Sequence, residues 1–406
     1  MTAPWKQVQG GVTAPEGFSA AGIACGIKTK GGKDLALLHS EQAAQWSAVL
    51  TTSQAPAAPV LLTGSLLRRR LPLHAVLVNS GNANSATGDA GTKAARTVVS
   101  EVADRCGLPS SAVVMASTGI IGVQLPLGKI LRSLPRLVRS LSDSGGKNAA
   151  EAIMTTDSVT KEAALELKLA GGKKIRIGGM AKGSGMIDPR MATMLAFLTT
   201  DASISRAALG RLLRRAVDRS FNRITVDGDR STNDTVLAMA NGASGVSVTA
   251  GSPVGELFAE GIMEVCRRLA VMIVRDGEGA TKFVEVRVAG ARSKADALKA
   301  ARAVANSALV KTAWFGRDLN WGRILAALGY SGAHIDPDKV SISVNGKAAV
   351  IGGAAVAREE FSAAQREMNR RDLLFTIGLG LGRGEESVMT CDLSLEYVRE
   401  NALYTT

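Results

Sequence analysis

The residues with the most evident chemistry lie in one run, residues 180–202. A Gly-rich segment, Gly183 to Gly185, precedes an Ala192–Thr193 step, and the apolar stretch 194–198 follows. This order suits a peptide bond that cuts itself: Thr193 Oγ attacks the Ala192 carbonyl, an ester forms, and water releases a new N-terminus. The freed threonine then holds a nucleophile and a base, its α-amine, whose ordinary pKa is about 8. The alternative is an ordinary strand start, because a short motif alone decides little.

The sequence offers few residues for other catalytic arrangements or for metal binding. The four cysteines are far apart and show no C-x-x-C spacing, which argues against a zinc site or a disulfide framework. The three histidines, His39, His74 and His334, are equally scattered. No Walker A sequence and no G-x-S-x-G elbow occurs. We therefore expect neither a metal ion nor a bound cofactor.

The composition indicates a globular chain. Its 406 residues predict about two or three domains at ~150 residues each. Apolar residues make up 46% of the chain, yet no apolar run approaches the ~20 residues that span a bilayer. The N-terminus lacks the charged-then-apolar pattern of a signal peptide. We therefore expect a cytoplasmic protein that does not insert into membranes.

The net charge of +13 raises the question of nucleic-acid binding, because basic patches attract phosphate. The arginines of residues 206–219, however, lie opposite an apolar helical face, as on a solvated helix. No basic run is interleaved with aromatic residues. We expect no nucleic-acid partner, and a basic surface also attracts anionic substrates.

Strand-like and helical segments alternate through the first part of the chain, as in an α/β protein. Buried strands are predicted at 75–78, 113–116, 195–198 and 271–274. Helices are predicted at 91–106, 148–154, 206–219 and 253–269, with Ser203 or Ser205 placed to cap the third.

The pattern changes near residue 285. Residues 283–288 alternate with period two, as a half-exposed strand does. Asn345–Gly346 is a strong hairpin signal between strands at 340–344 and 347–351. Helices are predicted at 293–311 and 357–371, and closing strands at 373–380 and 386–393. The chain is therefore divided into residues 1–285 and 286–406.

Distinctive motifs also occur outside residues 180–202. They are 14–18, 20–23, 78–84, 117–122, 154–157, 226–229, 231–235, 275–282, 318–323 and 401–406. In this order, and spread over the whole chain, they resemble those of the ornithine acetyltransferase family, also called the bifunctional glutamate N-acetyltransferases of arginine biosynthesis.

The resemblance implies an autoprocessed acetyltransferase. Ala192–Thr193 would be the cleavage site, and Thr193 would carry acetyl from N2-acetylornithine to glutamate. Bifunctional members also use acetyl-CoA as donor, and the residues do not decide whether this chain does. The alternative is an N-terminal-nucleophile amidohydrolase or aminopeptidase, in which water takes the acyl group. A basic binding protein without enzymatic activity is a third, more distant reading.

The resemblance also assigns site residues. Thr118 and Gly119, which follow the predicted strand 113–116, would form the oxyanion hole. The positions that would line the substrate pocket are Thr156, Lys182, Thr193, Glu278, Asn401 and Thr406. Lys182 suits a substrate carboxylate, and Glu278, in a Gly-flanked loop, suits the ammonium group of ornithine. The alternatives without a catalytic or binding role are a plain turn for Thr118–Gly119, a solvated side chain for Lys182 and a loop carboxylate for Glu278. Thr155 and Thr156 cannot be separated by sequence, and Thr156 is chosen.

The fold implied by the resemblance is α/β. It consists of a layered α/β/β/α main domain of the N-terminal-nucleophile-like aminopeptidase and ornithine acetyltransferase type. A smaller C-terminal α/β domain follows, whose tail returns to the active site. The pieces 1–192 and 193–406 would stay associated, as an α2β2 heterotetramer.

Overall fold

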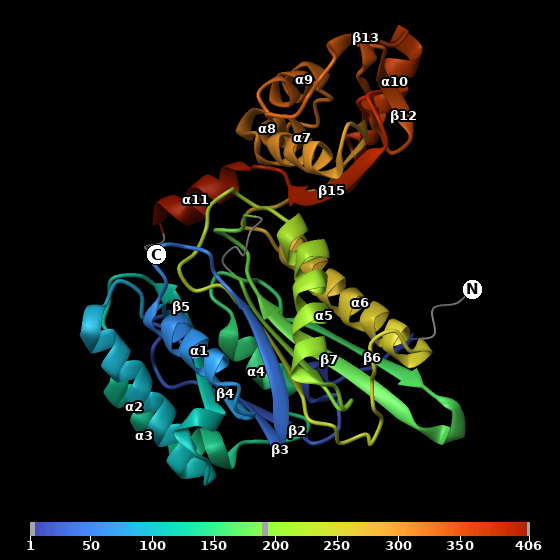
Figure 1. The fold of residues 1–406 in the computed structure, drawn as a ribbon. Helices are drawn as coiled ribbons and strands as arrows, with labels where there is room; N and C mark the ends of the chain where they lie inside the picture. Colours follow the sequence, from blue (N-terminus) through green and yellow to red (C-terminus); the bar gives the residue numbers. More distant parts are fainter. Residues whose placement is uncertain (1–4, 189–193, 404–406) are drawn as a thin grey trace.

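A computed structural model of the chain describes residues 5–188 and 194–403. Its larger part is built on a nine-stranded sheet with the order β1-β6-β7-β8-β9-β3-β4-β5, and β2 pairs with β3 (Figure 1). The strands are β1 (Trp5–Gln7), β2 (Phe18–Ile23), β3 (Leu35–Leu50), β4 (Leu73–Asn82), β5 (Val113–Ile120), β6 (Lys161–Lys168), β7 (Lys174–Lys182), β8 (Leu195–Thr200) and β9 (Thr235–Ala240).

The long strand β3 connects two halves of this sheet. Its first part pairs with β2 and β4, and its second part, from Gln45, pairs with β9. Apolar side chains of the two halves pack against one another in a shared core, to which β4 contributes Val78 and β8 contributes Phe197. The sheet therefore forms two facing layers rather than one open surface.

Helices cover the outer faces of both layers. Helices α5 (Arg206–Arg219) and α6 (Pro253–Arg275) pack on β6 to β9, and α2 (Gly88–Cys106) and α3 (Leu127–Arg139) pack on β4 and β5. Helix α4 (Gly146–Ile153) contributes to the core between the layers, and α1 (Ala58–Arg69) lies beside α2. The predicted α/β/β/α layering is thus confirmed, and Ser205 caps α5 by accepting from the Ala208 amide.

The strand predicted at residues 271–274 is wrong. Helix α6 continues through this segment to Arg275. Although Val271 and Val274 have β-branched side chains, the buried positions Cys266, Leu269, Ala270 and Ile273 keep the helical spacing along one face. Burial against the sheet therefore outweighs the local strand propensity.

A second, six-stranded sheet has the order β13-β12-β11-β14-β10-β15 and its own apolar core. Its strands are β10 (Phe283–Ala291), β11 (Ser341–Val344), β12 (Lys347–Ile351), β13 (Ala354–Ala355), β14 (Asp372–Gly378) and β15 (Gly384–Cys391). Its helices are α7 (Lys294–Asn306), α8 (Ala308–Phe315), α9 (Trp321–Gly329) and α10 (Arg358–Glu367). The division of the chain at residue 285 stays a prediction.

Two local predictions in this second part have different outcomes. The hairpin at Asn345–Gly346 is confirmed, since both residues have positive φ, 47° and 78°, as a type I′ turn requires. The single helix predicted at 293–311 is interrupted at Ser307, whose side chain accepts from the Val310 amide and so starts α8.

The last described helix, α11 (Leu395–Leu403), returns from the second sheet to the first part of the molecule (Figure 1). Strands β7 and β8 are antiparallel neighbours, with Lys182 opposite Leu195. Within residues 5–188 and 194–403, no helix combines the length and apolar character needed to cross a membrane.

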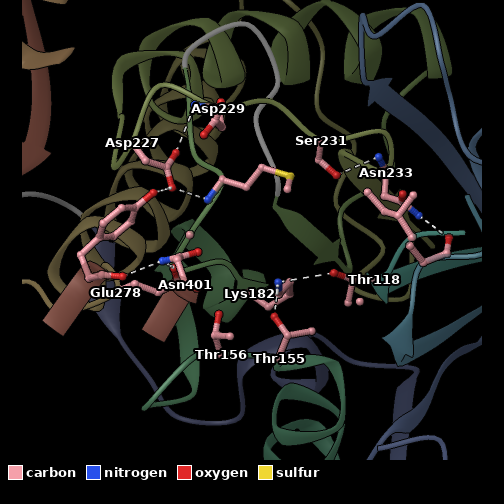
Figure 2. Close-up of a pocket in the computed structure, with 16 residues that line it drawn as sticks. Thr118, Thr155, Thr156, Lys182, Asp227, Asp229, Ser231, Asn233, Glu278 and Asn401 are labelled. Atoms are coloured by element: carbon pink, nitrogen blue, oxygen red, sulfur yellow. Dashed lines mark hydrogen bonds between the residues drawn. The ribbon is translucent and has the colours of Figure 1, made fainter. Parts of the chain in front are cut away.

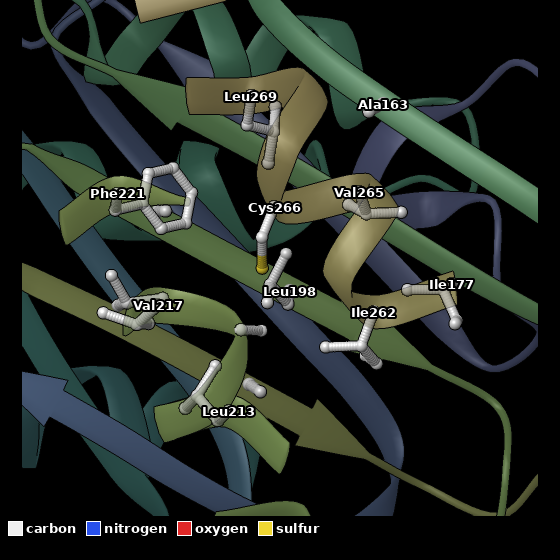
Figure 3. Packing of buried hydrophobic residues seen from close by; sticks show 14 of the residues in the cluster. Ala163, Ile177, Leu198, Leu213, Val217, Phe221, Ile262, Val265, Cys266 and Leu269 are labelled. Atoms are coloured by element: carbon white, nitrogen blue, oxygen red, sulfur yellow. The ribbon is translucent and has the colours of Figure 1, made fainter. Parts of the chain in front are cut away.

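The core between the sheet and α6 offers a test of packing. Leu198 of β8 is 1% exposed and lies under α6 near Cys266 and Leu269 (Figure 3). Leu198→Ala should lower the free energy of unfolding by about 2–5 kcal/mol, because it removes buried methyl groups and leaves a cavity. Urea denaturation would measure the loss. The matched control is Leu61→Ala in α1, where the side chain is 54% exposed and the expected change is below about 0.5 kcal/mol.

Candidate active site

One pocket gathers residues from several distant segments of the chain. It lies where β5 and β7 end, beside the loop 227–233 and helix α11 (Figure 2). Its lining comprises Ala83, Thr118, Gly119, Ile121, Thr155, Thr156, Lys182, Gly185, Met186, Asp227, Asp229, Ser231, Asn233, Glu278, Tyr397 and Asn401. Six residues predicted as site residues are therefore brought together here: Thr118, Gly119, Thr156, Lys182, Glu278 and Asn401.

Lys182, the last residue of β7, supplies a buried cation. Its side chain is 3% exposed, and Nζ donates to Thr155 Oγ1 at 2.7 Å and to Thr118 Oγ1 at 3.4 Å. Burial lowers the pKa of this ammonium group, while Asp157, 4.0 Å away, acts in the opposite direction. The alternative of a solvated lysine is wrong.

Lys182 ends a buried row of alternating charges. Asp157 accepts from Lys161 Nζ at 2.6 Å, and Lys161 also donates to Asp276 at 2.5 Å. Burial opposes ionisation of Asp157, but Lys182 and Lys161 together hold its pKa at about 2. Asp157 therefore remains ionised, and it also accepts from the Gly183 and Thr155 amides. One carboxylate thus fixes the lysine and the turn that follows β7.

Thr118 and Gly119 lie at the end of β5, against the parallel strand β4. Gly119 has φ 132°, and a Cβ at this position would lie 2.3 Å from the Gly81 carbonyl carbon. Only glycine fits this backbone. An oxyanion hole needs hydrogen-bond donors beside the reacting group, and Thr118 and Gly119 both line the pocket.

The opposite wall is acidic. Glu278 accepts from Asn401 Nδ2 at 2.8 Å, and its own amide donates to Ser184 O. Gly185 permits this arrangement, because a Cβ there would lie 2.3 Å from Glu278 Oε2. In Figure 2, Glu278, Asn401 and Asp227 face Thr118 and Asn233 across the pocket, with Lys182 between the two walls.

Thr155 and Thr156 have different partners. Thr155 Oγ1 accepts from Lys182, whereas Thr156 Oγ1 shares a hydrogen bond with Ser184 Oγ at 2.7 Å. Both line the pocket, so the choice of Thr156 as the substrate contact stays a prediction. The predicted residues Ala192, Thr193 and Thr406 lie outside the described residues.

Sequence reasoning missed Asp227 and Tyr397. Asp227 accepts from the Met186 and Ile187 amides at 2.5 and 2.8 Å, and Tyr397 OH donates to it at 3.4 Å. Met186 has φ 57°, an uncommon conformation for a residue other than glycine. Asp227 thereby holds the segment that leads toward residue 189. The sequence shows the motif Val-Asp-Gly-Asp around Asp227, but no local pattern in it indicates that Asp227 contacts the Met186 and Ile187 amides.

The site thus combines a buried cation, hydroxyl groups, a strand end that requires glycine and an acidic wall. Within the described ranges, no group of three or more His, Cys, Asp or Glu side chains is arranged to hold a metal ion. Such a pocket suits a small molecule that carries both a carboxylate and an ammonium group, and it suits acyl chemistry.

Comparison with known proteins agrees with this class. The model of the ArgJ family matches residues 19–406. The chain is 48% identical over 400 residues to the arginine biosynthesis bifunctional protein ArgJ of Symbiobacterium thermophilum, covering 98% of this chain and 99% of that protein. The corresponding Geobacter sulfurreducens protein is also 48% identical, over 96% of this chain and 99% of its own.

Two solved structures are also similar. ArgJ from Bacillus halodurans is 38% identical with a TM-score of 0.49, covering 51% of this chain and 97% of that chain. Ornithine acetyltransferase from Mycobacterium tuberculosis, solved with ornithine, is 39% identical with a TM-score of 0.42, covering 46% and 98%.

The family match and the curated relatives decide the assignment. The chain is an enzyme of the ArgJ family, and the predicted membership of the ornithine acetyltransferase family is confirmed.

The carboxyl group of Asp227 predicts a pH-dependent stability. Burial raises its pKa from 3.8 to about 6, although the backbone amides that donate to this carboxyl group lower the pKa. An unfolded aspartate releases the proton near pH 3.8, so this group's contribution to stability is complete below that pH and is lost as the pH rises through 6. Between pH 5 and 7 the loss should be about 1 kcal/mol.

Urea denaturation at these two pH values measures the effect. Asp227→Asn has no proton to release and should abolish this part of the pH dependence. Asp229→Asn removes an exposed neighbouring charge that is the smallest contribution to the raised pKa, so it should retain most of the effect. An unchanged pH profile in Asp227→Asn would contradict the assignment.

Proposed function

We propose that this enzyme is an autoprocessed glutamate N-acetyltransferase, which moves acetyl from N2-acetylornithine to glutamate through an acetyl-Thr193 intermediate. The observation that carries the proposal is the pocket itself. A buried lysine, the Thr118–Gly119 end of β5 and an acidic wall meet beside the start of β8, two residues after Thr193.

The proposed self-cleavage follows from threonine chemistry. Thr193 Oγ bonds to the Ala192 carbonyl carbon, the carbon–nitrogen bond breaks, and water hydrolyses the resulting ester. The product is a free α-amine on Thr193, which takes the proton of Oγ when the hydroxyl attacks the acetyl group of the donor. The amide bond of N2-acetylornithine breaks, and the protonated α-amine gives its proton to the departing nitrogen of ornithine. The amine of glutamate then attacks the acetyl ester, and its proton returns through the α-amine to Thr193 Oγ.

Thr118 and Gly119 are proposed to stabilise the negative oxygen that forms in each acyl transfer. A hydrogen-bond donor placed at that oxygen typically lowers the barrier by about 3–4 kcal/mol. The positive charge of Lys182, which contacts Thr118, adds to the favourable potential.

The two walls account for substrate selection. Both N2-acetylornithine and glutamate carry an α-carboxylate, for which Lys182 is the proposed partner. Only ornithine carries a side-chain ammonium group, for which Glu278 is the proposed partner. Thr156, Asn401 and Thr406 are proposed as uncharged contacts.

The proposed cleavage leaves a shared sheet. Strands β8 and β9 come from the downstream piece, yet they lie between β7 and β3 of the upstream piece. We therefore propose that pieces 1–192 and 193–406 stay associated, in an α2β2 assembly.

The separate cores support the proposed domains 1–285 and 286–406. We also propose that acetyl-CoA serves as a second acetyl donor and that the enzyme is located in the cytoplasm.

The nucleophile is tested by Thr193→Ala. Purified wild-type enzyme should give two polypeptides that meet at Ala192/Thr193, whereas Thr193→Ala should give one full-length, inactive chain, since it lacks the attacking oxygen. Intact mass and acetyl transfer from N2-acetylornithine to glutamate measure both effects. Thr193→Ser keeps a hydroxyl and should retain cleavage and activity. Hydrolysis of the donor that does not depend on glutamate would instead favour an amidohydrolase.

The substrate walls are tested by KM values of the cleaved enzyme. Lys182→Met removes the charge for the α-carboxylate and should raise KM for both substrates by about 10–100-fold. Glu278→Gln should raise KM for N2-acetylornithine by about 10-fold and leave KM for glutamate within about 3-fold. The control is Lys174→Met, at the exposed opposite end of β7. Equal effects of Glu278→Gln on both substrates would contradict the assignment of this wall.

A further inference from the structure

Two adjacent buried side chains, Asn233 and Asp234, connect the separate halves of the proposed site. They precede β9, and they are 4% and 0% exposed. Asn233 lines the pocket, but the proposed chemistry assigns a role to neither residue.

Asn233 holds the end of β5, which carries Thr118. Its Nδ2 donates to the Ser117 carbonyl oxygen at 2.9 Å and to the Ala83 carbonyl oxygen at 2.7 Å. Ser117 is bonded directly to Thr118, and Ala83 directly follows β4. One amide group therefore fastens the ends of both parallel strands. The backbone amide of Asn233 in turn donates to Ser231 Oγ (Figure 2).

Asp234 holds the residue that follows Thr193. Its Oδ1 accepts from the Met194 amide at 3.0 Å, and the next residue, Thr235, donates its amide to the Met194 carbonyl oxygen at 3.2 Å. The Asp234 carbonyl oxygen accepts from the Thr51 amide. Met194, which is bonded to Thr193, is thus fixed at both its polar backbone groups.

We propose that Asn233 and Asp234 act together as the positioning pair that sets the separation between the Thr118–Gly119 end of β5 and the nucleophile. This inference rests on the proposed function. Because the two residues share a peptide bond, the two anchoring side chains can shift relative to each other only through rotations within this buried, hydrogen-bonded segment. Acyl transfer requires the nucleophile and the oxyanion donors at a fixed distance, and a 1 Å displacement can cost about 10²-fold in rate.

The hydrogen-bonding oxygen of Asp234 matters for this role, and its negative charge does not. Burial raises the pKa of Asp234 well above its ordinary value, so the carboxyl group resists ionisation. An uncharged amide of the same size, with one carbonyl oxygen, can accept from Met194 equally well. The conservative change Asp234→Asn should therefore rescue what Asp234→Ala loses.

The test compares Asn233→Ala, Asp234→Ala and Asp234→Asn in the full chain. For the cleaved fraction of each, kcat and KM for N2-acetylornithine are measured with glutamate as acceptor, and the extent of cleavage is followed by intact mass. We expect Asn233→Ala and Asp234→Ala to lower kcat by about 10–100-fold with KM within about 3-fold, since geometry and not substrate affinity is lost. Asp234→Asn should keep kcat and cleavage within about 3-fold of the wild type.

Asn241→Ala is the matched control for stability. Asn241 is another buried asparagine whose Nδ2 donates to a backbone carbonyl, that of Glu16, away from the pocket. It should lower the thermal midpoint without changing kcat of the folded enzyme. A merely structural role for Asn233 would give this same result.

A kcat within about 3-fold of the wild type in Asn233→Ala, or an Asp234→Asn variant as impaired as Asp234→Ala, would overturn the inference. If Asn233→Ala yields no folded protein, the two Asp234 variants decide alone. An active Thr193→Ala variant would overturn the proposed function itself. Loss of activity in Thr193→Ala together with an unaffected Asn233→Ala would remove only the positioning pair.

Discussion

The candidate site depends on a buried ion pair between Lys182 and Asp157. A lysine that is almost fully buried is costly unless a carboxylate compensates for its lost hydration, and a lone buried carboxylate is equally costly. Lys161 and Asp276 extend the alternation toward the protein surface, so that each internal charge has opposite neighbours. Removal of one partner from such a pair typically costs about 3–5 kcal/mol. The row therefore fixes β7, the turn after it and the pocket cation in one arrangement.

The layered fold explains why motifs far apart in the sequence converge. Parallel pairing puts the ends of β4 and β5 side by side, and Asn79 Oδ1 accepts from Ser117 Oγ across this pair at 2.6 Å. The antiparallel pair β7–β8 brings Lys182 next to the residues that follow Thr193. Glu278 reaches the same place because α6 runs along the sheet and ends at Arg275, just before its loop.

Local patterns predicted most of this architecture, since helices such as α5 have an apolar face with helical spacing and strands such as β5 begin as short apolar runs. They failed at Val271–Val274, where burial along α6 outweighs strand propensity, and at Ser307, which divides a predicted helix. The site residues were predicted through family motifs, not through geometry. Asp227 was missed because its partners, the Met186 and Ile187 amides, lie about 40 residues away and no spacing rule connects them.

The interior position of β8 and β9 has a consequence for the order of events in biosynthesis. A chain still emerging from the ribosome has β7 but not the two strands that belong beside it, and it also lacks the Asp234 contact to Met194. If Thr193 frees its own amine as proposed, we expect cleavage to follow the insertion of these later strands. Incomplete or misassembled chains would then stay uncleaved and inactive, and only the complete fold would give active enzyme.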